Sequence, residues 1–257
     1  MTAIDAEDFR ALARSSPWRW RTVQLVVQYV GAYPEHPRPV RAFVARPAGI
    51  RVEELDGTLI SAMWDRPHTP NWPSNAAEFR VDGLLARRPD EHDPYQFDDP
   101  MFGSYRWVSM LNPFELADGA PFENGHVDGL WSADLAPIVV HGGVSDGEWN
   151  GRRVWTAVVE ATENYASRCS CCPVLVGDHS VRRLAQENNG MTVPQRQWPQ
   201  AQRVRLDVQT GILVQLEEIG GHRPRGRLDG ADRGGGSGLA KRTFRRVKCR
   251  SRVRVAG

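Results

Sequence analysis

The chain has 257 residues, 40% of them hydrophobic, and its 33 Lys and Arg nearly balance its 31 Asp and Glu. No run of about 18 apolar residues occurs, which excludes an integral membrane helix. The apolar and aromatic content excludes a wholly disordered chain.

The small net charge of +2 is the sum of two unlike parts of the chain. Residues 222–257 hold 12 Lys and Arg against two Asp, a charge of +10, so residues 1–221 carry −8. Residues 234–238 read GGGSG, which is typical of a flexible linker. We therefore expect a folded domain over 1–221 and a disordered, Arg- and Gly-rich basic tail over 222–257.

The first elements are a short helix and a strand. Residues 4–13 carry apolar side chains among charges at helical spacing, and we expect Pro17 to end this helix. Residues 19–30 then change to a period of two, which predicts a strand with one buried face.

Three short strands and a long irregular region follow. The strands are expected at 40–46, 50–55 and 59–64, and the turn dipeptide Asp56-Gly57 predicts an antiparallel connection. Residues 65–100 are rich in Pro, Asp and Arg, which indicates long loops around one short segment at 79–86.

The second half mixes helical and strand patterns. Residues 105–116 predict a helix-loop-helix interrupted by Pro113, and 181–189 predict a short helix. The predicted strands are 138–142, 152–160, 203–207 and 212–217. Asp146-Gly147 and Asn150-Gly151 are turn dipeptides, and Gly211 suits the positive φ of a bulge in the last hairpin.

These elements predict an α+β fold. Most strands are antiparallel neighbours, and their single apolar face needs a cover that the few helices supply. We expect a curved antiparallel β-sheet, an incomplete barrel, wrapped over one or two helices.

Several motifs resemble one known superfamily. The strand GRRVWTAVVEAT (151–162) and the later hairpin DVQTG (207–211) resemble the outer-membrane lipoprotein carrier superfamily, which includes LolA-like carriers and RseB/MucB-like regulators. The stretches SPWRWRTVQLVV and RCSCCPVL look closest to uncharacterised members from high-GC bacteria. The resemblance covers about residues 1–221. It implies a half-barrel whose concavity binds acyl chains, lipoproteins or partner peptides without catalysis.

A cysteine cluster stands out in RCSCCP. Three thiols lie within four residues, and thiolates bind soft metals such as Zn²⁺. The candidate metal ligands are Cys169, Cys171, Cys172 and His179. A disulfide or redox pair and an inert thiol cluster remain open as alternatives, and no other cofactor is expected.

The nine tryptophans are the second candidate feature. Large aromatic side chains fill cores, and they also line apolar grooves for ligands. We expect Trp18 and Trp20 to point the same way on a strand. The candidate ligand-binding residues are Trp18, Trp20, Trp64, Trp107 and Trp155.

The basic tail is the third feature. Its KRTFRRVKCRSRVRV segment could neutralise phosphates, so a nucleic-acid or membrane-surface role is one alternative. An inert tail, or a shifted reading frame in GC-rich coding sequence, is the interpretation we favour.

The combined expectation is a protein that is not an enzyme. The common nucleophile, zinc-protease, phosphate-loop and dinucleotide motifs do not occur in the sequence. The leading hypothesis is a binding protein that holds an apolar ligand or a protein partner in the concave face of the sheet. The alternatives are a metal- or redox-responsive module and a basic-tailed nucleic-acid binder. The early acidic residues do not resemble a secretory signal, so we expect a cytoplasmic location, with envelope association left open.

Overall fold

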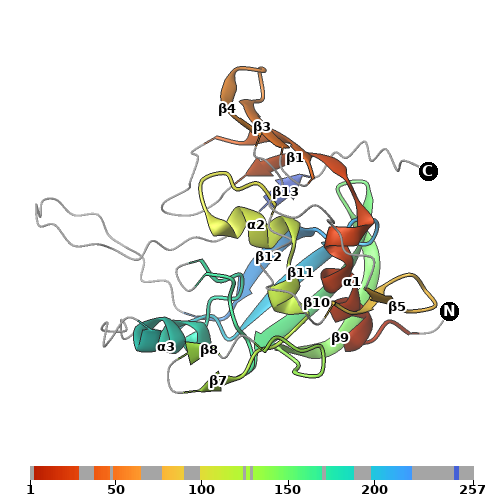
Figure 1. Ribbon diagram of the computed structural model, residues 1–257, viewed down its shortest axis with the longest axis vertical. Helices are drawn as coiled ribbons and strands as arrows, with labels where there is room; N and C mark the ends of the chain where they lie inside the picture. Colours follow the sequence, from red (N-terminus) through yellow and green to blue (C-terminus); the bar gives the residue numbers. More distant parts are fainter. Residues whose placement is uncertain are drawn as a thin grey trace, which may run out of the picture.

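The computed structural model describes residues 3–28, 38–46, 49–64, 77–89, 99–123, 126–127, 130–169, 172–187, 198–221 and 246–248. Its fold is α+β, as predicted, with two larger antiparallel sheets (Figure 1). The strands described do not close into a barrel.

The first sheet has five strands in the order β13-β1-β2-β3-β4. Their bounds are Arg246–Lys248 (β13), Thr22–Gln28 (β1), Val40–Ala45 (β2), Gly49–Glu54 (β3) and Leu59–Trp64 (β4). The predicted strands at 40–46, 50–55 and 59–64 are confirmed within a residue or two. The predicted strand at 19–30 begins later, at Thr22, and residues 29 and 30 lie outside the described part.

The second sheet has four strands in the order β12-β11-β10-β9. Their bounds are Leu213–Ile219 (β12), Ala201–Asp207 (β11), Arg152–Ala161 (β10) and Ile138–Trp149 (β9). β12 lies beside β13, so the two sheets adjoin at this edge. Two short hairpins add Glu78–Phe79 (β5) with Leu85–Arg87 (β6), and Phe122–Glu123 (β7) with His126–Val127 (β8).

The prediction of a turn at Asp146-Gly147 is wrong, because β9 continues through both residues to Trp149. Asp146 is held in the ladder by Arg153, whose Nε lies 2.9 Å from one of its carboxylate oxygens. The turn lies at Asn150-Gly151 instead, where both residues have positive φ, as a tight hairpin turn requires.

The described residues include three α-helices and one 3₁₀ helix beside the sheets. Their bounds are Ala6–Arg19 (α1), Tyr105–Leu111 (α2), Asp178–Glu187 (α3) and Phe114–Leu116 (η2). The α2–Pro113–η2 arrangement confirms the predicted helix-loop-helix. α3 begins three residues before the predicted start, and residues 188 and 189 of the predicted helix lie outside the described part.

The prediction that Pro17 ends the first helix is wrong. α1 begins at an Asp5–Asp8 capping box and runs through Pro17 to Arg19. Contacts elsewhere in the fold hold this last turn, since Arg19 donates to the carbonyl oxygen of Val208 at 2.8 Å. Ser16 donates likewise to the carbonyl of Leu111 at 2.6 Å.

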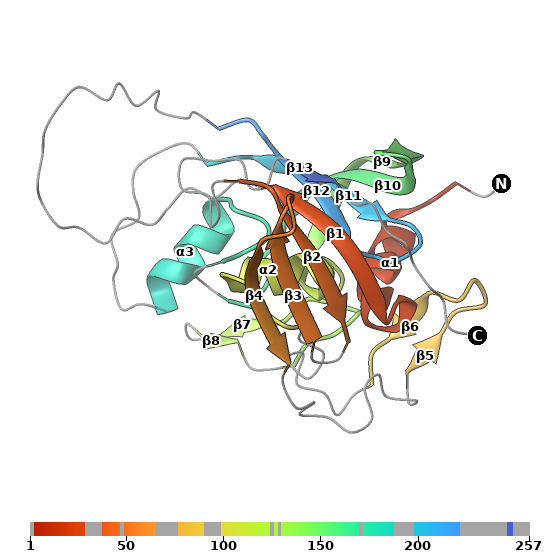
Figure 2. The ribbon, with the colours of Figure 1, turned by 90° about the horizontal axis from the view of Figure 1, so that it is seen from above.

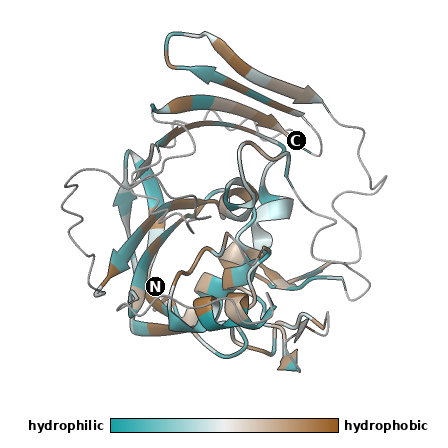
Figure 3. Ribbon diagram, turned by 90° about the vertical axis from the view of Figure 1, so that its left-hand side faces the viewer, coloured by the Kyte–Doolittle hydropathy of each residue, from teal (hydrophilic) through white to brown (hydrophobic). Residues whose placement is uncertain are grey.

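One hydrophobic core joins both sheets to α1 and α2, and Figure 2 shows how these strands and helices are arranged. We call the sheet face that packs on these helices the inner face. Val23, Leu25, Val44 and Val52 lie on it in the first sheet and are at most 3% exposed. Hydrophobic and hydrophilic residues alternate along the strands (Figure 3), so the opposite, outer face of β1–β4 carries a second set of side chains.

Candidate functional site

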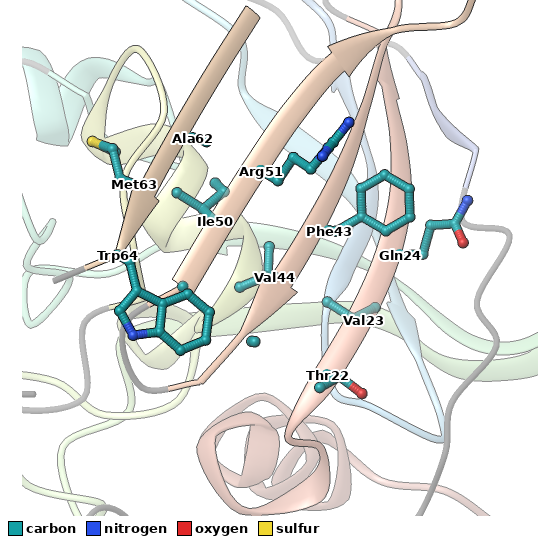
Figure 4. A pocket seen from close by; sticks show the side chains of 12 residues that line it. Thr22, Val23, Gln24, Phe43, Val44, Ile50, Arg51, Ala62, Met63 and Trp64 are labelled. Atoms are coloured by element: carbon teal, nitrogen blue, oxygen red, sulfur yellow. The ribbon is translucent and has the colours of Figure 1, made fainter. Parts of the chain in front are cut away.

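A groove of about 520 Å³ runs over strands β1 to β4. Strand register places its outer-face side chains in two cross-strand rows, the first being Gln24, Phe43, Arg51 and Ala62. The second row is Thr22, Ala45, Gly49 and Trp64. We call these eight residues the outer groove (Figure 4).

Two exposed aromatic side chains line the outer groove. Phe43 is 38% exposed and Trp64 is 80% exposed. The indole of Trp64 lies across Gly49, where a Cβ would fall within 2.6 Å of the ring carbon Cε3. Gly49 therefore provides the space that lets the indole lie against the sheet, leaving the rest of the ring open to solvent.

The polar edge of the outer groove has an excess of positive charge. Arg41 and Arg51 both pair with the buried carboxylate of Glu53, at 3.1 and 3.3 Å. Two cations share one anion, so the cluster carries a net charge of about +1. The Arg51 side chain is 56% exposed and lies beside Phe43 on the neighbouring strand. An apolar surface next to surplus positive charge suits an amphiphile with an anionic head.

The five predicted tryptophans do not meet in one place. Trp20 and Trp107 are core residues, at 4% and 0% exposure. Trp20 follows α1 directly rather than lying on a strand with Trp18, which is half-buried within α1. Trp155 is half-buried on β10 and packs against the core. Only Trp64 lines the outer groove.

Phe43 and Arg51 were missed as site residues by reasoning from the sequence. The signal is present in the alternation of 40–45, where Val40, Ala42 and Val44 share one face and leave Phe43 on the other. A large aromatic on the face expected to be polar is the pattern that could have identified it.

The structure describes Cys169, Cys172 and His179 of the cysteine cluster, while Cys171 lies outside the described residues. Among the residues that are described, no group of three or more His, Cys, Asp or Glu could hold a metal ion. The predicted zinc site therefore has no support from its three described members. His179 lies on α3, and burial, followed by the charge of Arg183, lowers its pKa.

A buried polar cluster anchors the chain on both sides of these cysteines. The Tyr165 hydroxyl donates to the Glu115 carboxylate at 2.5 Å and accepts from the Leu175 amide at 3.0 Å. Burial raises the pKa of Glu115, although bonds from Tyr165 and the Val174 amide oppose this. Both side chains are fully buried, so the cluster acts on structure rather than on a substrate.

The basic tail contributes three described residues, Arg246–Lys248, which pair antiparallel with β1 as strand β13. We expected the whole tail to lie outside the fold. These three residues instead form part of the first sheet. The remainder of 222–257 lies outside the described residues, so its expected disorder and its nucleic-acid alternative stay predictions.

Comparison with known proteins identifies no relative of this chain. No protein-family model, no curated protein and no solved structure matches this chain. The resemblance to the lipoprotein carrier superfamily thus stays a prediction. No helix in the described ranges has the length and apolar character needed to cross a membrane.

Proposed function

We propose that this protein is a non-enzymatic binding protein whose outer groove holds an acyl chain with an anionic head group. The observation that carries the proposal is that two exposed aromatic side chains, Phe43 and Trp64, share the outer face with a positively charged cluster. In this cluster, Arg41 and Arg51 both form ion pairs with Glu53. An acyl chain would lie against the rings, and its carboxylate would face Arg51.

The proposed site is on the opposite face of the sheet from the one that the superfamily resemblance implies. The inner face of β1–β3 packs into the core that also contains α1 and α2, and its side chains Leu25, Ala42 and Val52 have no exposed surface. The outer face of β1–β4 has the groove volume and the exposed apolar area that a chain-like ligand requires.

The test is a titration of the full chain with a fluorescent long-chain fatty acid. Trp64→Ala should weaken binding about 30-fold, because losing a large aromatic contact typically removes about 2 kcal/mol. Phe43→Ala should weaken it by a similar factor. Phe79→Ala is the matched control, since Phe79 is a 53% exposed phenylalanine on β5 that does not line the groove.

The head-group contribution is tested with the alcohol of the same chain length. The alcohol should bind wild type more weakly than the acid, and Arg51→Gln should reduce this preference. If the Trp64, Phe43 and Phe79 variants all bind the fatty acid as tightly as wild type does, the outer groove is ruled out as the site. Loss of binding in all three would indicate a general effect on the fold instead, and would also count against the proposal.

A further inference from the structure

The chain around Cys169 and Cys172 is held at both ends by buried side chains. On one side, Arg168 donates to the carbonyl oxygen of Asn112 at 3.0 Å and stacks over Phe114, with its guanidinium carbon 4.3 Å from the ring centre. Arg168 is 4% exposed. The backbone that leads into Cys169 is therefore fixed against the α2–η2 region.

On the other side, the backbone after Cys172 is fixed by the same region. Arg106 of α2 donates to the carbonyl oxygen of Pro173 at 3.4 Å. The Val174 amide donates to Glu115 at 3.3 Å, and the Leu175 amide donates to the Tyr165 hydroxyl. Both flanks of the cysteine segment thus have defined positions before any bond forms between the thiols.

A backbone hydrogen bond brings the two cysteines together. The amide of Cys172 donates to the carbonyl oxygen of Cys169 at 3.0 Å, which is an i to i+3 bond. A backbone hydrogen bond from residue i+3 to residue i keeps the Cα atoms of these two residues within about 7 Å of each other. Disulfide-bonded cysteines have Cα atoms about 4.4–6.8 Å apart, so this hydrogen bond holds the pair at a separation that a disulfide can span.

The two thiols differ in access. Cys169 is half-buried and can be reached by a small reagent, whereas Cys172 is only 9% exposed. In thiol–disulfide exchange an accessible thiolate forms the mixed disulfide, and a neighbouring thiol resolves it. The difference in exposure assigns the first role to Cys169 and the second to Cys172.

We propose that Cys169 and Cys172 form a reversible dithiol–disulfide pair that exchanges with small-molecule disulfides. The Cys169 thiolate attacks one sulfur of the small disulfide, whose S–S bond breaks, and the released thiolate takes up a proton. The Cys172 thiolate then attacks the Cys169 sulfur and expels the second thiolate, which is also protonated. The protein loses two electrons and two protons, and the small disulfide becomes two thiols.

The test uses the full chain in excess oxidised glutathione, with thiol counting and peptide mapping by mass spectrometry before and after return to excess reduced glutathione. Wild type should lose two thiols, give a Cys169–Cys172 cross-linked peptide, and regain both thiols on reduction. Cys171→Ser and Cys249→Ser are the matched controls and should keep this behaviour. Cys169→Ser and Cys172→Ala should abolish it.

Each other outcome overturns the proposal. A cross-link that needs Cys171 or Cys249, a covalent dimer, or an unchanged thiol count would each exclude the Cys169–Cys172 pair. The wild-type peptide map is decisive by itself, so the result does not depend on how well the Cys172 variant folds. Fatty-acid binding at the outer groove is a separate measurement, and its failure would leave this test unaffected.

Discussion

Breaking the buried ion pair between Arg46 and Asp99 should strongly destabilise the fold. Both side chains are fully buried, and Arg46 contacts the carboxylate through Nε at 2.6 Å and through Nη2 at 2.8 Å. Arg46 also donates to the carbonyl oxygen of Ser16 at 2.6 Å and lies over the Trp20 ring at 3.3 Å from its centre. The pair therefore joins the end of β2 to α1 and to the chain at Asp99.

Asp99→Asn removes the counter-charge that Asp99 supplies to the buried Arg46 guanidinium. Burial lowers the pKa of Arg46, because it disfavours the charged guanidinium, and the charge of Asp99 opposes that effect. Breaking such a pair from one side typically costs about 3–5 kcal/mol of unfolding free energy. A domain of this size should lose about 10 °C in Tm at that cost, on the order of 2–4 °C per kcal/mol.

The assay is urea unfolding followed by tryptophan fluorescence, run as a double-mutant cycle with Arg46→Met and Asp99→Leu. Each single variant should be strongly destabilised, while the double variant should recover much of the loss, because two apolar side chains have no charge to bury. A loss below about 1 kcal/mol for Asp99→Asn would refute the reasoning. A double variant as unstable as the sum of the single ones would refute it equally.

Three further predictions concern other parts of the molecule. Burial raises the pKa of Glu115 above its ordinary value of 4.5, so the folded state holds this proton more tightly than the unfolded state and loses stability as rising pH removes it. The free energy of unfolding of Glu115→Gln relative to wild type should therefore grow from about pH 4.5 toward neutrality. A difference in urea midpoint between variant and wild type that stays constant over this pH range would contradict this. Gly211→Ala should cost about 2–4 kcal/mol in urea unfolding, because Gly211 has φ +73° and its new Cβ would lie 2.6 Å from the Leu12 carbonyl oxygen. Gly57→Ala has a similar φ of +96° but open space, so it should cost only about 1–2 kcal/mol, and equal losses would disprove the role of the contact with α1. Trp64→Ala should weaken fatty-acid binding without lowering the free energy of unfolding by more than about 1 kcal/mol, since the side chain is 80% exposed, and a larger loss would assign it a structural role.

The strands could be predicted where period-two alternation met a clear turn. The β11–β12 hairpin shows this, because Val204 and Leu206 alternate with arginines and Gly211 follows with φ +73°. Local sequence patterns predicted the wrong element boundaries where contacts with distant residues determine the backbone conformation. Pro17 stays inside α1 because residues far along the chain hold the last turn, and Asp146-Gly147 stays in a strand because Arg153 pairs across the ladder.

The candidate site could be predicted only in part. Trp64 was identified from its residue type, but Phe43 and Arg51 join it through the register of β2, β3 and β4. That register includes an irregularity between Val52 and Glu53, which no local pattern in the sequence reveals. The burial of Trp20 could not be predicted from local sequence either. Trp20 lies beneath Arg46, and Arg46 is held by Asp99, which is 53 residues away in the chain.

The most direct test of the binding proposal is photo-cross-linking of a diazirine-labelled fatty acid to the full chain, followed by peptide mapping. Acyl binding in the outer groove predicts that the label attaches to peptides of β2, β3 and β4, including Phe43 or Trp64, and that unlabelled fatty acid competes it away. Attachment to α1, α2 or the inner-face residues of the sheets would contradict it.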